Sequence, residues 1–418
     1  MEKQRIAIIG SGISGLTTAY LLHKSYEITL FEANDYIGGH THTVKVAQGE
    51  QSYDIDTGFI VCNDRNYPNF LKLMDKLNIA MQPTEMSFSV RNNPLGLEYN
   101  GHNINTLFSQ RRNLLRPKFY RLIRDILYFN KAAKKAIEEG VAENITLDTF
   151  VNQQSLSDIF KNNYLLPMAA AIWSCSLEQA GEFPLYFFLK FFLNHGLLDI
   201  KNRPQWYAVK GGSKAYIDPM TSGFKDRIRL STPVNSVIRN DSCIEVNHAT
   251  GKETFDQLVF ACHSDQALDL LKNASIEEKA ILGELLYQQN DVILHSDASL
   301  MPTKSLSWAS WNFLAGEQEH NDPTLVTYCM NILQGTASDQ PFLVSLNARH
   351  KIDPEKIIGE YNYAHPVYSV AGMKAQCRRN EISGVGRIHY CGAYWYNGFH
   401  EDGVRSALDI GEKFGASL

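Results

Sequence analysis

Three glycines near the start of the chain have the G-x-G-x-x-G spacing of a turn that binds phosphate. They follow an apolar run at residues 6–9, which predicts a buried strand, and precede an apolar helical face that begins at Leu16. The free N–H groups and the positive dipole end of such a helix attract an anion. The spacing therefore predicts a diphosphate site at Gly10, Ser11, Gly12, Ile13, Ser14 and Gly15.

An acidic residue follows at the end of the next predicted strand. Residues 28–31 form this strand, and Glu32 lies 17 residues beyond Gly15, beside Ala33. A carboxylate in this place accepts hydrogen bonds from the hydroxyl groups of a ribose. Because strand, glycines, helix, strand and acid occur in this order, we interpret the segment as a dinucleotide-binding unit rather than a structural turn.

A second glycine pair, Gly38 and Gly39, is followed directly by His40 and Thr41. Adjacent glycines permit a close approach of the backbone, and the polar side chains behind them can contact a phosphate. We predict a second phosphate contact here. The alternative is a glycine-rich loop whose histidines face solvent.

Composition and charge exclude several classes of protein. The chain has 418 residues, a formal net charge of −5 and seven cysteines without a C-x-x-C pair. We therefore expect two lobes and no nucleic-acid partner, disulfide framework or metal site. The first predicted strand begins within six residues, so we expect no signal or transit peptide, and Lys190 interrupts the most apolar segment, residues 183–198. We expect a cytoplasmic protein without a membrane-spanning helix.

The sequence after residue 81 predicts a second lobe with its own surface. Apolar residues alternate with polar ones on both sides of a turn at residues 92–94, which predicts a β-hairpin. A predicted helix follows, and between Arg111 and Lys135 it holds nine Lys or Arg residues and one acid, Asp125. These charges form either a solvated helix face or a basic surface for the headgroups of an anionic membrane.

Residues 165–198 are dense in Leu, Phe and Ala. They predict either a buried helical core or the wall of an elongated apolar substrate tunnel, because small-molecule sites are lined mainly by such residues. Both interpretations place the apolar part of this lobe inside the protein.

Four motifs resemble the flavin amine-oxidase superfamily. The sequence GGH with Thr43 resembles the GGR motif of the family and its following threonine, and residues 54–60 resemble the loop that passes the flavin ring. Val234 and Val237 match a strand that contacts the adenine. Residues 387–407 resemble the final strand, glycine loop and helix of the family. The resemblance covers essentially the whole chain.

This resemblance implies an α/β fold, α+β overall, in which a Rossmann-like FAD-binding domain of the GR2 type is interleaved with a substrate domain of mixed or antiparallel sheet plus helices. The FAD-binding domain is expected at residues 1–80, 205–265 and 380–418, and the substrate domain at residues 81–204 and 266–379. The implied cofactor is non-covalently bound FAD. The further predicted contacts are Thr57, Gly58, Phe59, Ile60, Val234, Gly392, Phe399, Glu401, Asp402, Gly403 and Val404.

The chain departs from the family pattern at two positions. His40 replaces the usual arginine, and Ala393 stands where an acid usually binds the cofactor, so we expect Glu401 or Asp402 to supply that contact. Cys391 precedes the loop, and we interpret it as a small apolar residue rather than a covalent link to flavin.

The resemblance also implies the type of reaction. The superfamily transfers a hydride from a C–H bond to flavin N5, and the cofactor carries this chemistry. The sequence shows no nucleophile triad or paired carboxylates, so His365 and His400 are the candidate bases. The superfamily often places a lysine near N5, and Lys304 is the candidate for that role. Trp308 lies in a predicted strand that presents one tryptophan to the flavin.

The sequences GGHTHT, WASWN and CGAYWYNGFHEDG together resemble one branch of the superfamily. These FAD-dependent proteins are associated with or fused to cyclopropane-fatty-acyl-phospholipid synthases. The branch implies oxidation or desaturation of a methylated or unsaturated fatty-acyl chain of a phospholipid, and a lipid methyltransferase as partner. The basic stretch from Arg111 to Lys135, with its predicted contact to an anionic membrane, and the apolar residues 165–198 independently favour such a substrate. Two alternatives are a soluble amine or amino-acid oxidase, with an aromatic cage from Tyr394, Trp395 or Tyr396, and a non-catalytic flavoprotein that scaffolds a lipid methyltransferase.

Overall fold

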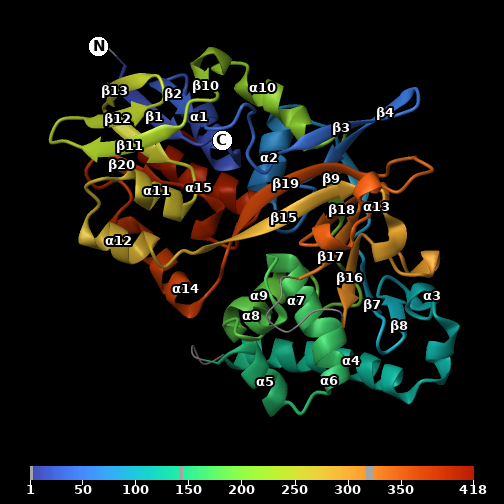
Figure 1. Ribbon diagram of the computed structural model, residues 1–418. Coiled ribbons are helices and arrows are strands. Elements are labelled where there is room, and N and C mark those ends of the chain that lie inside the picture. The colour runs from blue at the N-terminus through green and yellow to red at the C-terminus, as the bar shows by residue number, and fades with distance from the viewer. Residues whose placement is uncertain (1–2, 141–144, 317–323) are drawn as a thin grey trace.

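The computed structural model describes residues 3–140, 145–316 and 324–418. One lobe is built on a five-stranded sheet in which all neighbouring strands are parallel (Figure 1). Four of the five residues of the first strand are buried, as expected for a parallel sheet covered on both faces. The strand order is β10 (Ile228–Arg229), β2 (Glu27–Phe31), β1 (Arg5–Ile9), β14 (Gln257–Phe260) and β20 (Ile388–Tyr390).

Two helices from opposite ends of the chain pack against each other in this lobe. They are α1 (Ile13–Leu22) and α15 (His400–Lys413). A Cβ atom at Gly403 would lie 2.6 Å from Cγ2 of Ile13, so the close contact between the helices requires a glycine there. The helix α2 (Pro68–Lys76) packs on α15 and buries Phe70, Leu73 and Met74.

A seven-stranded mixed sheet forms the second lobe and is antiparallel except for the parallel pair β16 and β7. Its longest strands, β15 and β19, run from this lobe toward the parallel sheet (Figure 1). The hairpin of β7 and β8 confirms the predicted one. The strand order is β19 (Ile357–Pro366), β15 (Tyr287–His295), β18 (Leu343–Leu346), β17 (Val326–Cys329), β16 (Trp311–Ala315), β7 (Phe88–Asn92) and β8 (Leu97–Asn100).

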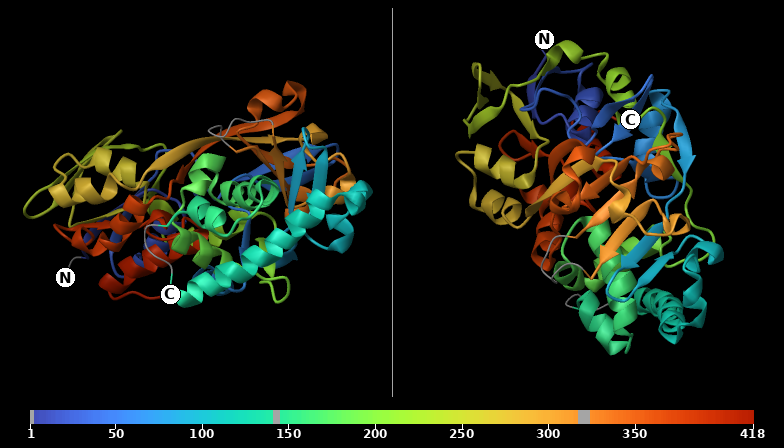
Figure 2. Two further views of the ribbon diagram at one scale, coloured as in Figure 1. Left: turned by 90° about the horizontal axis from the view of Figure 1, so that it is seen from below. Right: turned by 45° about the vertical axis from the view of Figure 1, so that its right-hand side comes forward.

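A layer of helices covers the end of the second lobe and contains most of residues 104–194. The longest of them, α4 (Pro117–Glu139), runs along the outside of the molecule (Figure 2). Behind it, Trp173 contacts the rings of four phenylalanines with centroid distances of 4.6–6.2 Å. The other helices of the layer are α3 (Ile104–Leu107), α5 (Leu147–Gln153), α6 (Asp158–Phe160), α7 (Leu166–Trp173), α8 (Leu177–Gly181) and α9 (Leu185–Asn194).

Smaller elements connect and extend the two lobes. Among the described residues, no helix is both long enough and apolar enough to span a bilayer. The small sheets contain β3 (Thr43–Gln48) with β4 (Gln51–Asp56), β5 (Val61–Asn63) with β9 (Trp206–Val209) and β6 (Met81–Thr84), and β11 (Val234–Arg239) with β12 (Ile244–His248) and β13 (Gly251–Phe255). The remaining helices are α10 (Ile217–Thr221), α11 (Ser264–Leu270), α12 (Ile276–Leu282), α13 (Met330–Leu333) and α14 (Val370–Cys377).

Candidate functional site

The first turn of the parallel sheet forms one wall of a large cavity. Gly10 adopts a φ of 104°, which favours glycine, and its N–H donates to the carbonyl of Phe31 at 2.9 Å. A Cβ atom at Gly12 would have no atom of another described residue within 4 Å, apart from its chain neighbours. The backbone at Gly12 is therefore open to a ligand, and the N-terminus of α1 faces the same space.

Glu32 lies beside this turn and is 7% exposed. Its Oε2 accepts hydrogen bonds from the backbone N–H of Ser11 at 2.9 Å and from the Ser11 hydroxyl at 2.6 Å, and its Oε1 accepts from the N–H of Asn34 at 2.9 Å. A carboxylate has about four acceptor sites, so Glu32 keeps room for a ligand hydroxyl. The hydrogen bonds hold it in place at the edge of the cavity.

The second glycine pair brings His40 to the cavity but turns Thr41 away from it. The Thr41 hydroxyl is buried and contacts the Tyr216 hydroxyl and Nε2 of His400, the latter at 3.1 Å. The predicted contact of Thr41 with the cofactor is therefore wrong, because this side chain is used inside the protein. Gly38 is likewise absent from the cavity lining, whereas Gly39 contributes to it.

The loop before α15 closes the opposite wall. His400 stacks on Phe59, with ring centroids 3.7 Å apart and an angle of 8° between the planes. Its Nε2 also lies 2.9 Å from the Tyr216 hydroxyl. These contacts come from three distant segments of the chain and fix His400 at the cavity surface.

The two acids of α15 do not reach the cavity. The carboxylate of Glu401 accepts from the backbone N–H groups of Asn69 at 3.2 Å and Phe70 at 2.8 Å, and so caps α2. Asp402 accepts from the N–H of Phe399 at 2.9 Å, and burial raises its pKa to about 7. The prediction that either acid binds the cofactor is wrong, because both are used to cap helices.

Gly403 and Val404 are also placed differently from the prediction. Neither lines the cavity, and both are buried where α15 packs on α1. Gly15 has a packing role as well, since its Cβ position lies 1.9 Å from the carbonyl oxygen of Gly10. The predicted cofactor contacts that do line the cavity are Gly10, Ser11, Gly12, Ile13, Ser14, Glu32, Ala33, Gly39, His40, Thr57, Gly58, Phe59, Ile60, Val234, Gly392 and Phe399.

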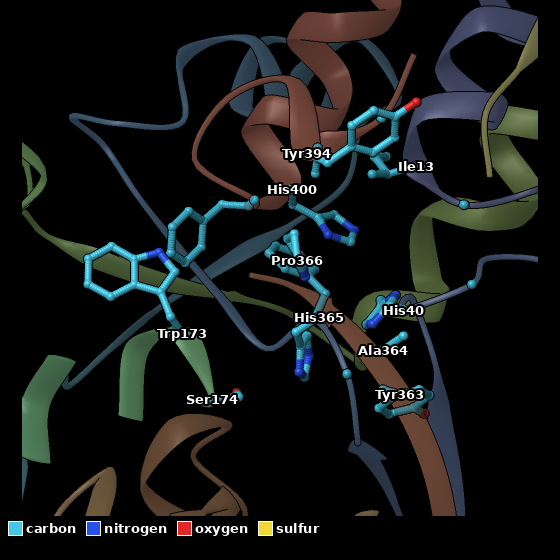
Figure 3. Close-up of a pocket in the computed structure, with 18 of the residues that line it drawn as sticks. Ile13, His40, Trp173, Ser174, Tyr363, Ala364, His365, Pro366, Tyr394 and His400 are labelled. Atoms are coloured by element: carbon cyan, nitrogen blue, oxygen red, sulfur yellow. The ribbon is translucent and has the colours of Figure 1, made fainter. Parts of the chain in front are cut away.

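The cavity has a volume of about 920 Å³ and continues from the glycine turn into the second lobe. Its far half is lined mainly by apolar and aromatic side chains, and Figure 3 shows Trp173 and Ser174 of the helical layer on the opposite side of this space from Ile13. Residues 165–198 are thus both a buried core and a wall of the cavity. This half is lined by Met86, Phe88, Tyr99, Tyr164, Met168, Ile172, Trp173, Phe191, His195, Leu197, Trp206, Trp311 and Tyr328.

Several histidines meet where the two halves join (Figure 3). The rings of His40 and His365 have centroids 5.5 Å apart, and those of His40 and His263 are 6.4 Å apart. Burial and, to a smaller extent, the neighbouring histidines lower the pKa of His365 to about 3 and that of His263 to about 3. These side chains are neutral in the folded protein at pH 7 when no ligand is present.

Of the four predicted catalytic residues, only His365 and His400 line the cavity. Lys304 is exposed outside it, and Trp308 donates from Nε1 to the carbonyl of Pro302 at 2.8 Å. A catalytic role for Lys304 or Trp308 is therefore not supported. The strand was predicted from Ser307 but begins at Trp311, so Trp308 lies outside it, after a 3₁₀ turn at residues 305–307. Trp311 is the tryptophan of this motif that lines the cavity.

Two functional candidates were missed by the sequence analysis. Trp173 and Tyr368 line the cavity and are 6% and 7% exposed, yet Trp173 Nε1 and the Tyr368 hydroxyl have no hydrogen-bond partner among the described residues. A buried donor without a partner indicates that a ligand or water satisfies it. The one sequence feature that could have pointed to Trp173 and Tyr368 is the high density of aromatic residues around each of them.

The residues of the first half fit FAD. Gly12 leaves the space that a diphosphate requires, and Glu32 is placed for a ribose. Nε2 of His40 is buried and has no hydrogen-bond partner in the described part of the chain. His40 stands in place of the arginine of the family motif, so that positive charge is absent. The N-terminus of α1 is therefore the main source of positive potential in this half. Cys391 does not line the cavity, and burial raises the pKa of its thiol to about 11, which agrees with a packing role.

Comparisons with known proteins give the family. Residues 13–281 match the family of flavin containing amine oxidoreductases. A segment of 59 residues is 41% identical to tryptophan 2-monooxygenase from Allorhizobium ampelinum and covers 14% of this chain and 8% of that protein. The chain thus spans only a small part of that relative.

Three solved structures share the fold. Cyclohexylamine oxidase from Brevibacterium oxydans has a TM-score of 0.68 and 13% sequence identity, over 99% of this chain and 100% of that chain. A redesigned putrescine oxidase has a TM-score of 0.70 and 14% identity, over 99% of this chain and 98% of that chain. A fatty acid isomerase from P. acnes that produces CLA has a TM-score of 0.69 and 15% identity, over 98% of both chains. The chain belongs to the family of flavin containing amine oxidoreductases and is an FAD-dependent oxidoreductase.

Proposed function

We propose that the enzyme desaturates or oxidises a methylated or unsaturated fatty-acyl chain of a phospholipid. The observation that carries this proposal is the chemistry of the far half of the cavity. Among the described residues, the acidic side chains that line the cavity are Glu32, which follows β2, and Asp269 of α11, which packs on β11. A buried ammonium group in the far half would therefore lack a carboxylate partner, whereas a hydrocarbon chain needs none.

Two further points support an acyl substrate. The fatty acid isomerase from P. acnes shares this fold, although at 15% identity the likeness concerns the fold alone. The motifs GGHTHT, WASWN and CGAYWYNGFHEDG resemble the branch associated with cyclopropane-fatty-acyl-phospholipid synthases. We assign the chain to that branch as part of the proposal, with a lipid methyltransferase as its partner.

FAD accepts a hydride at N5 when it is bound. The residues of the chain hold the acyl group, exclude water and orient the polar end of the substrate. The ring of Phe187 contacts both Trp173 and Tyr368, with centroid distances of 5.4 and 5.0 Å. Both rings therefore pack around Phe187, and we propose that their unpartnered donors bind the ester carbonyl group of the substrate.

The outer side of the helical layer is suited to a membrane surface. Leu115 is 88% exposed, and Leu114, Tyr120, Leu127 and Tyr128 are also exposed. The basic residues between Arg111 and Lys135 lie on the same two segments, residues 111–115 and α4. Exposed apolar side chains flanked by positive charge are typical of an interfacial helix on anionic lipid. We propose that this face binds the membrane that supplies the substrate.

The lysines and arginines of this face are only partly neutralised by the protein. Arg121 and Arg124 bind Asp125, with distances of 3.0 and 3.2 Å, and Lys134 binds Asp199. Lys118 and Lys131 are exposed and form no ion pair among the described residues. The face therefore keeps a net positive charge, which complements anionic headgroups.

An amine or amino-acid oxidase is the second candidate, because the aromatic rings of the cavity can hold a cation by cation–π contacts. Of the residues expected to form its cage, only Tyr394 lines the cavity. Trp395 packs under Arg379, and the Tyr396 hydroxyl donates to Asp409 at 2.6 Å. This arrangement favours the acyl substrate.

Anaerobic reduction of the bound flavin distinguishes the candidates. We expect unsaturated or methyl-branched phospholipids to bleach the flavin absorbance, and cyclohexylamine, putrescine and tryptophan to leave it unchanged. Bleaching by an amine alone would replace the proposal with an amine oxidase. A flavin that no substrate reduces would indicate the non-catalytic scaffold.

A further inference from the structure

A relay of three hydrogen bonds links the backbone of Asp291 to the ring of His365. The N–H of Asp291 donates to Oδ1 of Asn347 at 3.1 Å, and Nδ2 of Asn347 donates to Oδ1 of Asn290 at 2.9 Å. Nδ2 of Asn290 then lies 3.0 Å from Nδ1 of His365. Because a backbone N–H can only donate, it sets the direction of every bond in the relay.

Two carbonyl groups fix the same direction independently. Nδ2 of Asn290 donates to the carbonyl of Gln288 at 3.3 Å, and Nδ2 of Asn347 donates to the carbonyl of Thr324 at 3.5 Å. Carbonyl oxygens can only accept, so neither amide can be turned round. Asn347 has a φ of 56°, a conformation that asparagine tolerates, and its own N–H donates to the carbonyl of Asp291 at 2.8 Å.

The relay determines where the proton of His365 lies. An amide nitrogen donates to Nδ1, so Nδ1 is the unprotonated nitrogen and the proton of the neutral ring is on Nε2. Nε2 has no hydrogen-bond partner among the described residues, and the ring lines the cavity. His365 thus offers an N–H group to whatever occupies this part of the cavity.

The position of His365 indicates which ligand receives that bond. Its ring lies beside His40 of the second glycine pair, and the next residue, Pro366, has its Cγ 3.2 Å from the Cβ position of Gly398, in the loop before α15. Both neighbours belong to segments that form the walls of the cofactor half, and Figure 3 shows His40, His365, Pro366 and His400 around one space. An acceptor atom of FAD is therefore the nearest candidate.

We propose that His365 is a hydrogen-bond donor to the bound flavin, held in its Nε2–H tautomer by Asn290 and Asn347, and not a base. A fixed donor stabilises the electron-rich reduced cofactor more than the oxidised one. Asn290 and Asn347 are positioning residues that act through His365. This inference requires FAD in the cavity but is independent of the substrate proposed above.

The tautomer is measured by NMR on the FAD-loaded protein with ¹⁵N-labelled histidine rings, and the H365F variant assigns the signals. We expect a protonated Nε2 and an unprotonated Nδ1 at position 365. In N290D the carboxylate can only accept, so the proton should move to Nδ1. The matched control N103D makes the same change at the exposed N-cap of α3, where aspartate caps as well as asparagine, and should alter nothing. A protonated Nδ1 in the wild-type protein would overturn the proposal.

The midpoint potential of the bound flavin tests the role. We expect N290D and H365F to lower the midpoint potential by at least about 30 mV. For a two-electron couple this corresponds to a tenfold weaker preference for the reduced cofactor. If N290D does not fold, N290A serves, because it removes the amide that donates to Nδ1 of His365, and the ring should then populate both tautomers. A reversed tautomer with an unchanged potential would mean that the donor does not face the flavin.

Discussion

A methyl group at Gly15 would lie 1.9 Å from the carbonyl oxygen of Gly10, whereas at Gly12 it would meet no described atom within 4 Å beyond its chain neighbours. Gly15 is therefore needed for the turn itself, and Gly12 only for the ligand. We expect G12A to keep its free energy of unfolding within about 0.5 kcal/mol of the wild-type value. FAD should bind at least tenfold more weakly, because the Cβ atom enters the diphosphate space.

Urea unfolding of the FAD-free protein and fluorescence titration with FAD measure the two quantities. G15A is the matched comparison and should lose about 3 kcal/mol or more, since a backbone carbonyl cannot move aside. Tight binding of FAD by G12A would show that the diphosphate lies elsewhere.

The donors of Trp173 and Tyr368 give a test of the acyl substrate. Each hydrogen bond to a neutral carbonyl contributes about 0.5–1.5 kcal/mol, so Y368F and W173F should slow flavin reduction by an ester about two- to tenfold. The control is an alkene of the same length without a carbonyl group, for which the variants and the wild type should behave alike. Equal effects on both substrates would argue against carbonyl recognition by these residues.

Membrane binding is expected to depend on the exposed leucines before α4. The double variant L114E/L115E should bind vesicles of anionic phospholipid at least tenfold more weakly, because it removes apolar contact and adds negative charge. I276E makes the same kind of change at a residue that is 82% exposed on α12 of the other lobe. Sedimentation with vesicles measures both, and equal losses would show that the face is not specific.

His295 lies outside the cavity lining, and we expect it to make the free energy of unfolding depend on pH. It is fully buried, its Nδ1 accepts from the N–H of Asp297 at 3.0 Å, and burial lowers its pKa to about 4. From pH 6.5 to about pH 4 the unfolded chain takes up a proton here and the folded chain does not. The unfolding free energy of the wild type should fall relative to H295N by about 1 kcal/mol per pH unit.

Urea unfolding at pH 7, 6 and 5 with saturating FAD gives this difference. It should be constant above pH 7, because both states are then neutral at residue 295. A difference that stays constant down to pH 5 would mean that His295 is protonated in the folded state.

Local motifs were predicted well because short-range physics determines them. The turn from Gly10 to Gly15, the strand that precedes Glu32 and the hairpin around residues 92–94 depend on neighbouring residues and on apolar periodicity. The contacts of Glu401 and Asp402 were predicted wrongly for the opposite reason. Their partners are backbone N–H groups whose positions are set by folding, and a sequence pattern cannot distinguish a cap from a ligand.

By itself, the sequence determined the dinucleotide-binding turn, the two-lobed α/β organisation and the resemblance to flavin-dependent oxidases. Only the tertiary structure placed Trp173, Tyr368 and His365 around one cavity and left Lys304 and Trp308 outside it. The physical reason is that spacing along the chain encodes the period of a helix or a strand, whereas a site is made by contacts between segments up to several hundred residues apart.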